Sequence, residues 1–446
     1  MAFYRNMVII LTHGLRNDAI GDAQHWPLRT TYMHKLMQRG TRLIGTSACP
    51  ADSGAMISLL TGRHARQHGH LDQMANPGRH IVHDGFPAVL HKAGYYLAGV
   101  GCVAPIMASM DESLLVQQVE HVRPTGCQYM AAMRNAGQLD VLVQQREQRQ
   151  RYGPFDPQRL VIDPDQDIDG YIGRRAQEQL LRMPTDRPWA LIVMFSGPGN
   201  ELPPPPLYQA LVDPRILEDG FKPVDLRNVD RYAELDYPRV LLQRLEPRQL
   251  GWIRSDYLGR VALIDHGVGR LMGALRRRGD RDHTWFMLTS DRGALLGEHG
   301  LIGHRSFLSA ALEVPVLIVP PTPTPRRDWQ SVLVNTIDVP ATITALGACD
   351  PPTGCRGQSL LPLLGDDFEQ VTTDGVCLSE FSRRLMLETS QHRVIFDTES
   401  HEALGLYDLM RDSAECENLV DTVAGENVLD GLRLKLANEL MPLHAA

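Results

Sequence analysis

The chain has 446 residues, of which 43% are hydrophobic and 22% are charged, and its formal net charge is −8. This composition is too apolar for a disordered protein, and the negative charge argues against nucleic acid as a partner. The longest apolar runs, residues 189–195 and 314–320, are far shorter than a membrane span, so we expect no membrane partner either.

The first predicted element is a strand at residues 7–11, a short apolar run of the kind that is buried on both faces in a parallel sheet. A helix follows at 33–39. A turn at 48–54 then leads into a short helix at 55–60. Two further buried strands are predicted at 95–100 and 190–195.

The clearest helix is predicted at residues 257–278, where apolar residues recur every three or four positions. Arginines 276–278 occupy its last turn, where we expect a solvated helix end, and Gly279 stops it. Strands follow at 285–289 and 314–319. Such alternation of buried strands and amphipathic helices predicts an α/β sandwich with a mostly parallel sheet.

The pattern of predicted elements changes after residue 364. Short strands at 371–381, 393–397 and 404–409 and a terminal helix at 429–440 predict a small antiparallel α+β subdomain. We therefore divide the chain into a core at residues 1–364 and a C-terminal subdomain at 365–446.

The seven cysteines are scattered, odd in number and without a C-x-x-C pair. This usage is typical of reduced thiols rather than of disulfides or a zinc site, and it predicts a cytoplasmic protein. The apolar run at residues 7–11 is too short for the core of a secretory signal.

Two strand ends stand out as places for chemistry, because ligands of open α/β sheets lie beyond the carboxyl ends of the strands. The first end is Thr12-His13-Gly14 and the second is Ser290-Asp291-Arg292. The Asp52-Ser53 turn opens a helix, and a helix N-terminus attracts anions. Together these pieces suggest an oxyanion pocket.

Four sequence blocks in this chain resemble those of the sulfatases of the alkaline phosphatase superfamily, nearest the cytoplasmic arylsulfatase/phosphonate monoester hydrolase branch. They are S-L-L-T-G-R at 58–63 with His68-Gly69, T-S-D at 289–291 with G-E-H-G-L at 297–301, D-V-P-A-T at 338–342, and L-Y-D-L at 406–409 with E-N-L at 417–419. Their order covers nearly the whole chain. The resemblance implies an alkaline-phosphatase-like α/β sandwich and an oligomer.

By this resemblance, the family's chemistry uses a divalent cation held by two adjacent Asp and by Asp plus Asn or His. It also uses a formylglycine nucleophile made from Cys within C-x-P-S-R. The cation and nearby basic groups offset the negative charge of the ester in the transition state.

Carried over by position, the chemical residues of the family are almost all replaced. The paired Asp fall on His13 and Gly14, and the later pair falls on Asp291 and Arg292. Asp291 is the only retained metal-ligand position. The nucleophile falls on Asp52 or Ser53, depending on where the count begins.

Other family positions fall on Cys102, on Gly199 and, in place of a lysine that faces the pocket, on His304. We count Arg292, Gln73 and Cys102 as candidate ligand-binding residues. Cys102 and Cys49 can also be read as small buried hydrophobes.

Arg292 is the most informative replacement, because a guanidinium at a ligand position repels a divalent cation and offers five donors. We expect a metal-free pocket in which Arg292 pairs with Asp291 and with Asp52. No cofactor is then required.

The sequence leaves structural interpretations open beside the catalytic ones. Asp52 and Ser53 are residue types that cap helices, and His13 can be a hydrogen-bonded structural histidine. His304 can donate a proton to a leaving group. His13, Asp52, Asp291 and His304 could together bind zinc or another transition metal.

Two functions follow from these observations. The first is a pseudoenzyme that has lost formylglycine and metal chemistry and binds a small anionic ester or a protein partner, as a homo-oligomer. The second is a hydrolase or transferase acting on sulfate, phosphate or phosphonate esters through Ser53 or Asp52 with His13 and His304. It would require a divalent metal such as Ca, Mg, Mn or Zn.

Overall fold

A computed structural model describes residues 5–71, 85–103, 118–121, 128–152, 162–199, 202–218, 245–322, 327–364 and 375–444. In this part of the chain, none of the helices is long and apolar enough to cross a membrane.

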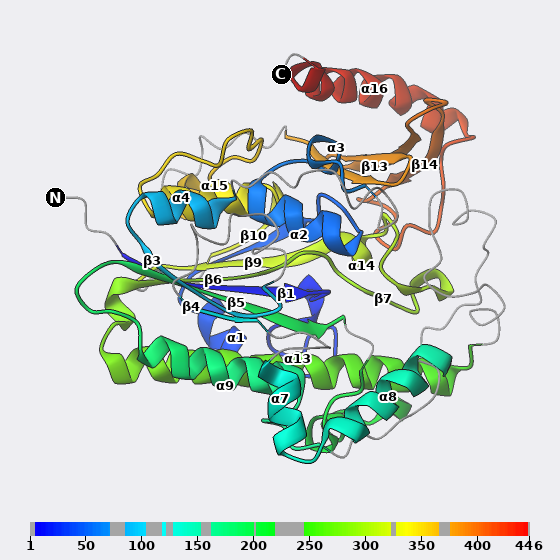
Figure 1. The fold of residues 1–446 in the computed structure, drawn as a ribbon. Coiled ribbons are helices and arrows are strands. Elements are labelled where there is room, and N and C mark those ends of the chain that lie inside the picture. The colour runs from blue at the N-terminus through cyan, green and yellow to red at the C-terminus, as the bar shows by residue number, and fades with distance from the viewer. Residues whose placement is uncertain are drawn as a thin grey trace.

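The centre of the molecule is a sheet that has eight strands in the described residues, in the order β10-β2-β9-β6-β1-β5-β3-β4 (Figure 1). The strands are β1 (Asn6–His13), β2 (Thr41–Thr46), β3 (Tyr96–Gly101), β4 (Gln118–His121), β5 (Trp189–Pro198), β6 (Thr284–Ser290), β9 (Glu313–Val319) and β10 (Arg327–Asn335). Strand β9 pairs antiparallel with β2 and β6, and the other pairings are parallel. The predicted mostly parallel sheet is confirmed.

Helices cover both faces of this sheet (Figure 1). One face carries α1 (Thr31–Met37), α9 (Ile168–Leu181) and α13 (Pro247–Arg278), and the other carries α2 (Asp52–Thr61), α4 (Phe86–Lys92) and α15 (Asp338–Leu346). The residues of β1 alternate between the two resulting cores, since Val8 and Ile10 belong to the first and Met7 and Ile9 to the second. The strand is therefore buried on both faces, as its apolar run predicts.

The remaining elements are shorter or lie outside these layers. They are α3 (Ala65–His68), α7 (Gln128–Asn135), α8 (Leu139–Tyr152), α10 (Pro206–Gln209), α14 (Ser309–Leu312), β7 (Leu295–Leu296), β8 (Ile302–Gly303), and the 3-10 turns Asn17–Ala19, Pro214–Leu217, Arg281–His283, Glu298–Gly300 and Leu361–Leu364.

The C-terminal region forms an antiparallel sheet of β11 (Cys377–Phe381), β12 (Arg384–Glu388), β13 (His392–Asp397) and β14 (Ala403–Asp408), followed by α16 (Val423–His444). One face of this sheet packs Leu387 and Val394 against α16, and the other adds Met386 and Ile395 to the main core. The antiparallel α+β subdomain is confirmed. Its boundary at 364/365 adjoins residues outside the described ranges and stays a prediction.

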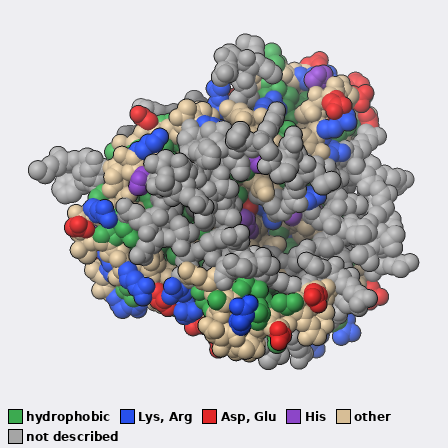
Figure 2. All heavy atoms as spheres, viewed as in Figure 1, with side chains coloured by type: hydrophobic (Ala, Val, Ile, Leu, Met, Phe, Trp, Pro, Cys, Tyr) green, Lys and Arg blue, Asp and Glu red, His purple; other side chains and the backbone are tan. Residues whose placement is uncertain are grey.

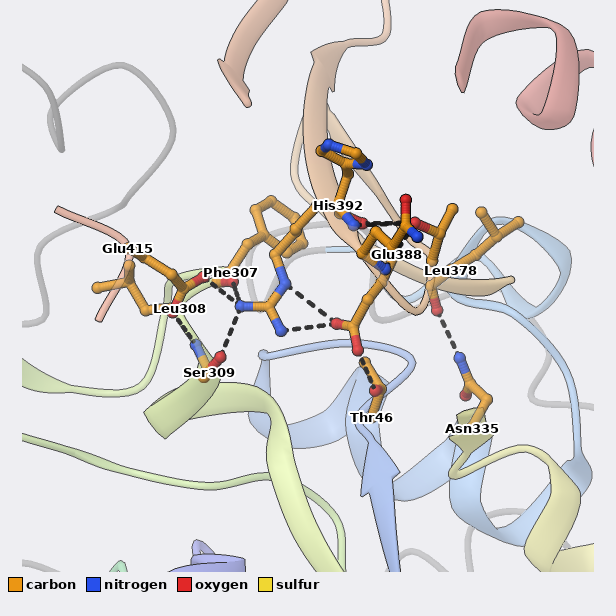
Figure 3. A network of polar contacts seen from close by, with 12 residues as sticks. Thr46, Phe307, Leu308, Ser309, Asn335, Leu378, Glu388, His392 and Glu415 are labelled. Carbon is orange, nitrogen blue, oxygen red and sulfur yellow. Dashed lines mark hydrogen bonds and ion pairs between the residues drawn. The ribbon is translucent and has the colours of Figure 1, made fainter. Parts of the chain in front are cut away.

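A buried arginine joins this subdomain to the core (Figure 3). Arg393 donates to Glu388, at 2.6 Å, and to Glu415, the carbonyl oxygen of Phe307 and the hydroxyl of Ser309. Burial alone would lower the pKa of this guanidinium, but the two carboxylates raise it above its ordinary value. Arg393 therefore stays charged inside the interface.

Two differences from the predicted elements have clear reasons. Helix α13 begins at Pro247, because Glu246 and Gln249 form a capping box in a polar stretch that carries little apolar periodicity. Arg278 is not part of a solvated end. It donates to the carbonyl oxygens of Leu181, the last residue of α9, at 3.2 Å, and of Met183, two residues further on, at 2.9 Å.

Candidate functional site

The candidate site lies where β1, β6 and β5 end side by side. Strands β1 and β6 pair in register, with Thr12 opposite Ser290, so that His13 and Asp291 both follow the last paired residues. On the other side of β1, His13 pairs with Pro198, and the Gly199 N–H donates to the His13 carbonyl oxygen at 2.8 Å. The two strand ends singled out in the sequence are therefore adjacent. Residues 198–199, at the end of β5, lie beside the first of them.

The carboxylate of Asp291 is fully buried and is bound by two protein donors. His13 Nδ1 lies 2.7 Å from Oδ2, and the Gly14 N–H donates to Oδ1 at 3.2 Å. Since Oδ2 can only accept from the imidazole, Nδ1 of His13 carries the proton. Both carboxylate oxygens thus have a hydrogen-bond partner from the protein, and His13 is one of them. The expected pairing of Arg292 with Asp291 and Asp52 stays a prediction.

The Arg292 guanidinium lies against the backbone of two glycines. A Cβ atom built on Gly14 would stand 2.9 Å from Arg292 Nη1 and 2.8 Å from the Gly199 Cα atom, and one built on Gly199 would stand 3.2 Å from the same nitrogen. Gly14 also has a φ of +77°, which side chains rarely adopt. The guanidinium therefore fills the space that a second aspartate at position 14 would need.

These residues do not fit the divalent cation that the family resemblance implies. Position 14 has no side chain, position 292 carries a permanent positive charge, and the one retained carboxylate is bound by N–H donors. In the described part of the chain no three His, Cys, Asp or Glu side chains gather as metal ligands. The transition-metal set of His13, Asp52, Asp291 and His304 stays untested, because the Asp52 side chain is not described.

The candidate nucleophiles lie in the first turn of α2. The helix begins at Asp52, and its N-cap is Ala51, which offers no capping side chain. Reading Asp52 or Ser53 as the N-cap was therefore wrong: the helix starts earlier than its apolar pattern shows. Ser53 is exposed.

The other predicted residues come from other segments of the chain. His304 follows β8 and is half-buried, and its carbonyl oxygen accepts from the Ser306 N–H at 2.7 Å. Cys102 follows β3 and packs against both cores, in agreement with its reading as a small hydrophobe. Gln73 lies outside the described residues.

Three hydroxyl groups fix the backbone of the site, and the sequence analysis assigned no such role to any of them. Ser47 Oγ donates to the Asp291 carbonyl oxygen at 2.6 Å, and the Ser290 hydroxyl accepts from the Leu15 N–H at 2.9 Å. The Tyr257 hydroxyl donates to the Gly14 carbonyl oxygen at 2.8 Å. No local motif announces these contacts, because each joins residues far apart in the chain.

A second network holds the loop after β5. Asp169 of α9 accepts from the N–H groups of Ser196, at 2.7 Å, and Gly197, at 3.1 Å. Arg260 of α13 lies 3.2 Å from the same carboxylate and donates to the carbonyl oxygens of Leu202 and Pro203. Burial raises the pKa of Asp169, and Arg260 opposes that rise. This network places Gly199 beside Arg292.

The surface over these strand ends is shown in Figure 2, where histidine and Lys or Arg side chains reach solvent near the centre of the view. The imidazole of His13 is 21% exposed, whereas Asp291 and Arg292 are buried. A ligand that approaches the strand ends from solvent can therefore reach His13.

Comparison with known proteins gives the same family over most of the chain. A family model described as "Sulfatase" matches residues 5–347, and one described as "N-sulphoglucosamine sulphohydrolase, C-terminal" matches residues 297–441. The uncharacterized sulfatase YidJ of Escherichia coli is 23% identical over 94% of this chain and 83% of its own length.

Other relatives match over shorter stretches. An N-acetylglucosamine-6-O-sulfatase of Bacteroides thetaiotaomicron is 30% identical over 25% of this chain, and the multifunctional alkaline phosphatase superfamily protein PehA of Trinickia caryophylli is 31% identical over 27%. The matches span only 20% and 24% of the length of those two relatives.

Solved structures share the fold. The phosphonate monoester hydrolase of Agrobacterium radiobacter superimposes with a TM-score of 0.75 at 17% identity, over 99% of this chain and 95% of its own. The phosphonate monoester hydrolase of Silicibacter pomeroyi gives 0.75 at 17%, over 98% and 95%. At these identities the similarity shows the alkaline-phosphatase-like fold alone. The family model matches residues 5–347, and this match shows that the chain belongs to the sulfatase family.

Proposed function

We propose that this sulfatase-family chain is a pseudoenzyme that binds a small anionic ester at the ends of β1 and β6 without a divalent cation. The observation that carries the proposal is the position of Arg292, whose Nη1 atom lies 2.9 Å from where a Cβ of residue 14 would stand. One side-chain cation thus takes the space of a carboxylate that the family resemblance assigns to metal binding.

A guanidinium and a metal ion support different chemistry. Both attract an anion, but a guanidinium does not coordinate a hydroxyl or water oxygen, so it does not lower the pKa of a nucleophile as a metal does. The Cys within C-x-P-S-R is also replaced, by Asp52 or Ser53. The groups that remain favour binding of an ester over its hydrolysis.

The experiment measures binding and turnover on the same protein. We expect 4-nitrophenyl sulfate to bind without release of nitrophenol, with or without added Ca²⁺, Mg²⁺ or Mn²⁺, and Arg292→Gln to weaken that binding about tenfold. Phosphate monoesters, phosphate diesters and phosphonates extend the turnover panel. A matched control is Arg278→Gln, since Arg278 is a partly buried arginine at the C-terminal end of α13, and its guanidinium contacts Asp280 and the Met183 carbonyl oxygen.

A rebuilt hydrolase is the second candidate, and the geometry of His13 favours it. A carboxylate 2.7 Å from Nδ1 orients the imidazole and stabilises its protonated form, as in acid–base pairs of hydrolases. Ser53 is exposed in the first turn of α2 and available as a nucleophile. In this case Ser53→Ala or Asp52→Asn abolishes turnover, and His304→Ala slows loss of the leaving group. Such results would overturn the proposal that the protein is a pseudoenzyme.

We further propose that the protein is cytoplasmic and forms a homo-oligomer. A protein partner is the alternative to the small anionic ester as the ligand. The cysteines support the cytoplasmic location, since the six in the described residues are all free thiols. Sedimentation velocity of the full chain tests this, because a species with the mass of one chain at micromolar concentration would contradict it.

A further inference from the structure

A second hollow lies at the opposite edge of the central sheet from the candidate site. It is a cavity of about 410 Å³ between α1 and the C-terminal end of α13, two helices that lie on the same face of the sheet (Figure 1). Thr284, the first residue of β6, lines it, whereas the candidate site follows the last residue of that strand, Ser290. The two places are therefore separated by the length of β6.

Four cationic side chains line this cavity: Lys35, Arg39, Arg276 and Arg281. Among the described residues, none of them forms an ion pair with a carboxylate. Arg39 Nε is inaccessible to solvent and has no hydrogen-bond partner there. Burial and the charge of Arg281 lower the pKa of Arg39, and Asp282 opposes this. The guanidinium groups of Arg39 and Arg281 thus repel one another, and Asp282 offsets part of this repulsion.

The floor of the cavity is apolar. Leu36 of α1, Met272 of α13 and Phe286 of β6 contribute to it. Helix α13 presents Gly273 here, and a Cβ at that position would meet only Arg277 Nη1, at 3.7 Å. The hollow therefore combines an apolar base with a rim of positive charge, which is the arrangement that amphipathic anions require.

We propose that this cavity binds a small phosphorylated molecule that carries an apolar or aromatic group. The four cations have two nearby acids, Asp282 beside Arg39 and Asp265 beside Lys35. The remaining excess of positive charge is offset better by a phosphate monoester dianion than by a singly charged sulfate ester. Arginine forks bind phosphate oxygens in pairs, and the apolar floor receives the organic group. The volume lies within the range of small-molecule sites.

Isothermal titration of the full chain with 1-naphthyl phosphate tests this proposal. We expect binding of one molecule per cavity, about tenfold weaker binding of 1-naphthyl sulfate and of inorganic phosphate, and a loss of affinity with added salt. Arg39→Gln and Arg281→Gln each weaken binding of the naphthyl phosphate at least tenfold. Arg281 is exposed, so its replacement leaves the fold intact.

Two further variants make the result specific to this cavity. Arg383→Gln removes an exposed arginine of the C-terminal sheet that does not line the hollow, and it leaves the affinity within twofold. His13→Ala alters the candidate site and also leaves it unchanged. The absence of binding by the wild-type chain would overturn the proposal. Full binding by both Arg39→Gln and Arg281→Gln would overturn it too. Loss of naphthyl phosphate binding in His13→Ala would also overturn it, because the ligand would then bind at the strand ends.

Discussion

Arg393 and Arg292 are both buried guanidinium groups, but they stand in different surroundings. Arg393 lies between two carboxylates, a hydroxyl and a carbonyl oxygen, and it joins the C-terminal sheet to the core (Figure 3). Arg292 lies against the backbone of Gly14 and Gly199 at the strand ends, beside a carboxylate that binds His13. The first arrangement is explained by structure alone, whereas the second occupies the place where chemistry is expected.

The largest effect is expected at Arg393. Arg393→Met leaves Glu388 and Glu415 buried without their cation, so we expect a loss of about 3–5 kcal/mol in the free energy of unfolding. Urea unfolding measures it. The matched control is Arg383→Met, which removes an exposed arginine paired with Glu399 and should cost less than about 1 kcal/mol. Equal losses in the two variants would show that the subdomain does not depend on this network.

The next effect sharpens the description of Arg292. Gly14→Ala places a Cβ against Arg292 Nη1 and the Gly199 Cα atom at a positive φ, and we expect a loss of roughly 2–3 kcal/mol. Gly279→Ala is matched in φ, at +74°, but no atom lies within 4 Å of its Cβ, so it should cost about 1 kcal/mol. Thermal unfolding compares them, and a Gly14 variant no less stable than the Gly279 variant would place the guanidinium elsewhere.

The stability of α3 and its contact with α2 is expected to depend on pH. Burial lowers the pKa of His68 to about 3 and that of His64 to about 4. His68 Nδ1 accepts from the His70 N–H, and its other ring nitrogen lies 2.9 Å from Ser58 Oγ, so protonation would disrupt the first contact.

Because both pKa values are depressed, the unfolded chain binds more protons, and stability is lost as the pH falls from about 6.5 to about 4 for His64 and to about 3 for His68. At pH 4.5 each histidine should account for roughly 2–3 kcal/mol of that loss. His68→Gln removes its share, so the stability of this variant should fall less steeply with acid. An unchanged acid dependence in denaturant unfolding would contradict the assignment.

The smallest effect separates two neighbouring arginines. Arg278→Gln removes hydrogen bonds to the carbonyl oxygens of Leu181 and Met183 at the end of α9, and we expect a loss of about 1 kcal/mol in the free energy of unfolding. Arg277→Gln removes an exposed side chain of the same turn and should be neutral. If the melting temperatures of the two variants coincide, the arginine run is the solvated helix end that its sequence suggests.

The sequence predicts those helices and strands whose pattern lies within the element itself. The apolar runs of β1, β5 and β6 and the stripe of α13 are of this kind, and so is Gly279, with its positive φ at the helix end. Strand β9 is also visible as a run, but its antiparallel direction is not, because direction depends on pairing with β2 and β6. Strand β2, with its mixed residues 41–46, carries too weak a pattern to be predicted.

The candidate site was only partly predictable for a related reason. The adjacency of His13 and Asp291 follows from the rule that parallel strands end at one edge. That Asp291 binds His13, and that Arg292 lies over Gly14, depends on side-chain directions that neither composition nor spacing contains. The supporting hydroxyl of Tyr257 comes from α13, more than two hundred residues from Gly14 along the chain.

The absence of a resident divalent cation at the ends of β1 and β6 is the central claim, and metal content tests it most directly. Elemental analysis of the purified full chain, paired with calorimetric titration by Ca²⁺, Mg²⁺ and Mn²⁺, should find far less than one ion per chain and no saturable binding at these strand ends. The melting temperature in EDTA should then equal that in buffer. One tightly held ion per chain, lost together with stability in EDTA, would contradict the account.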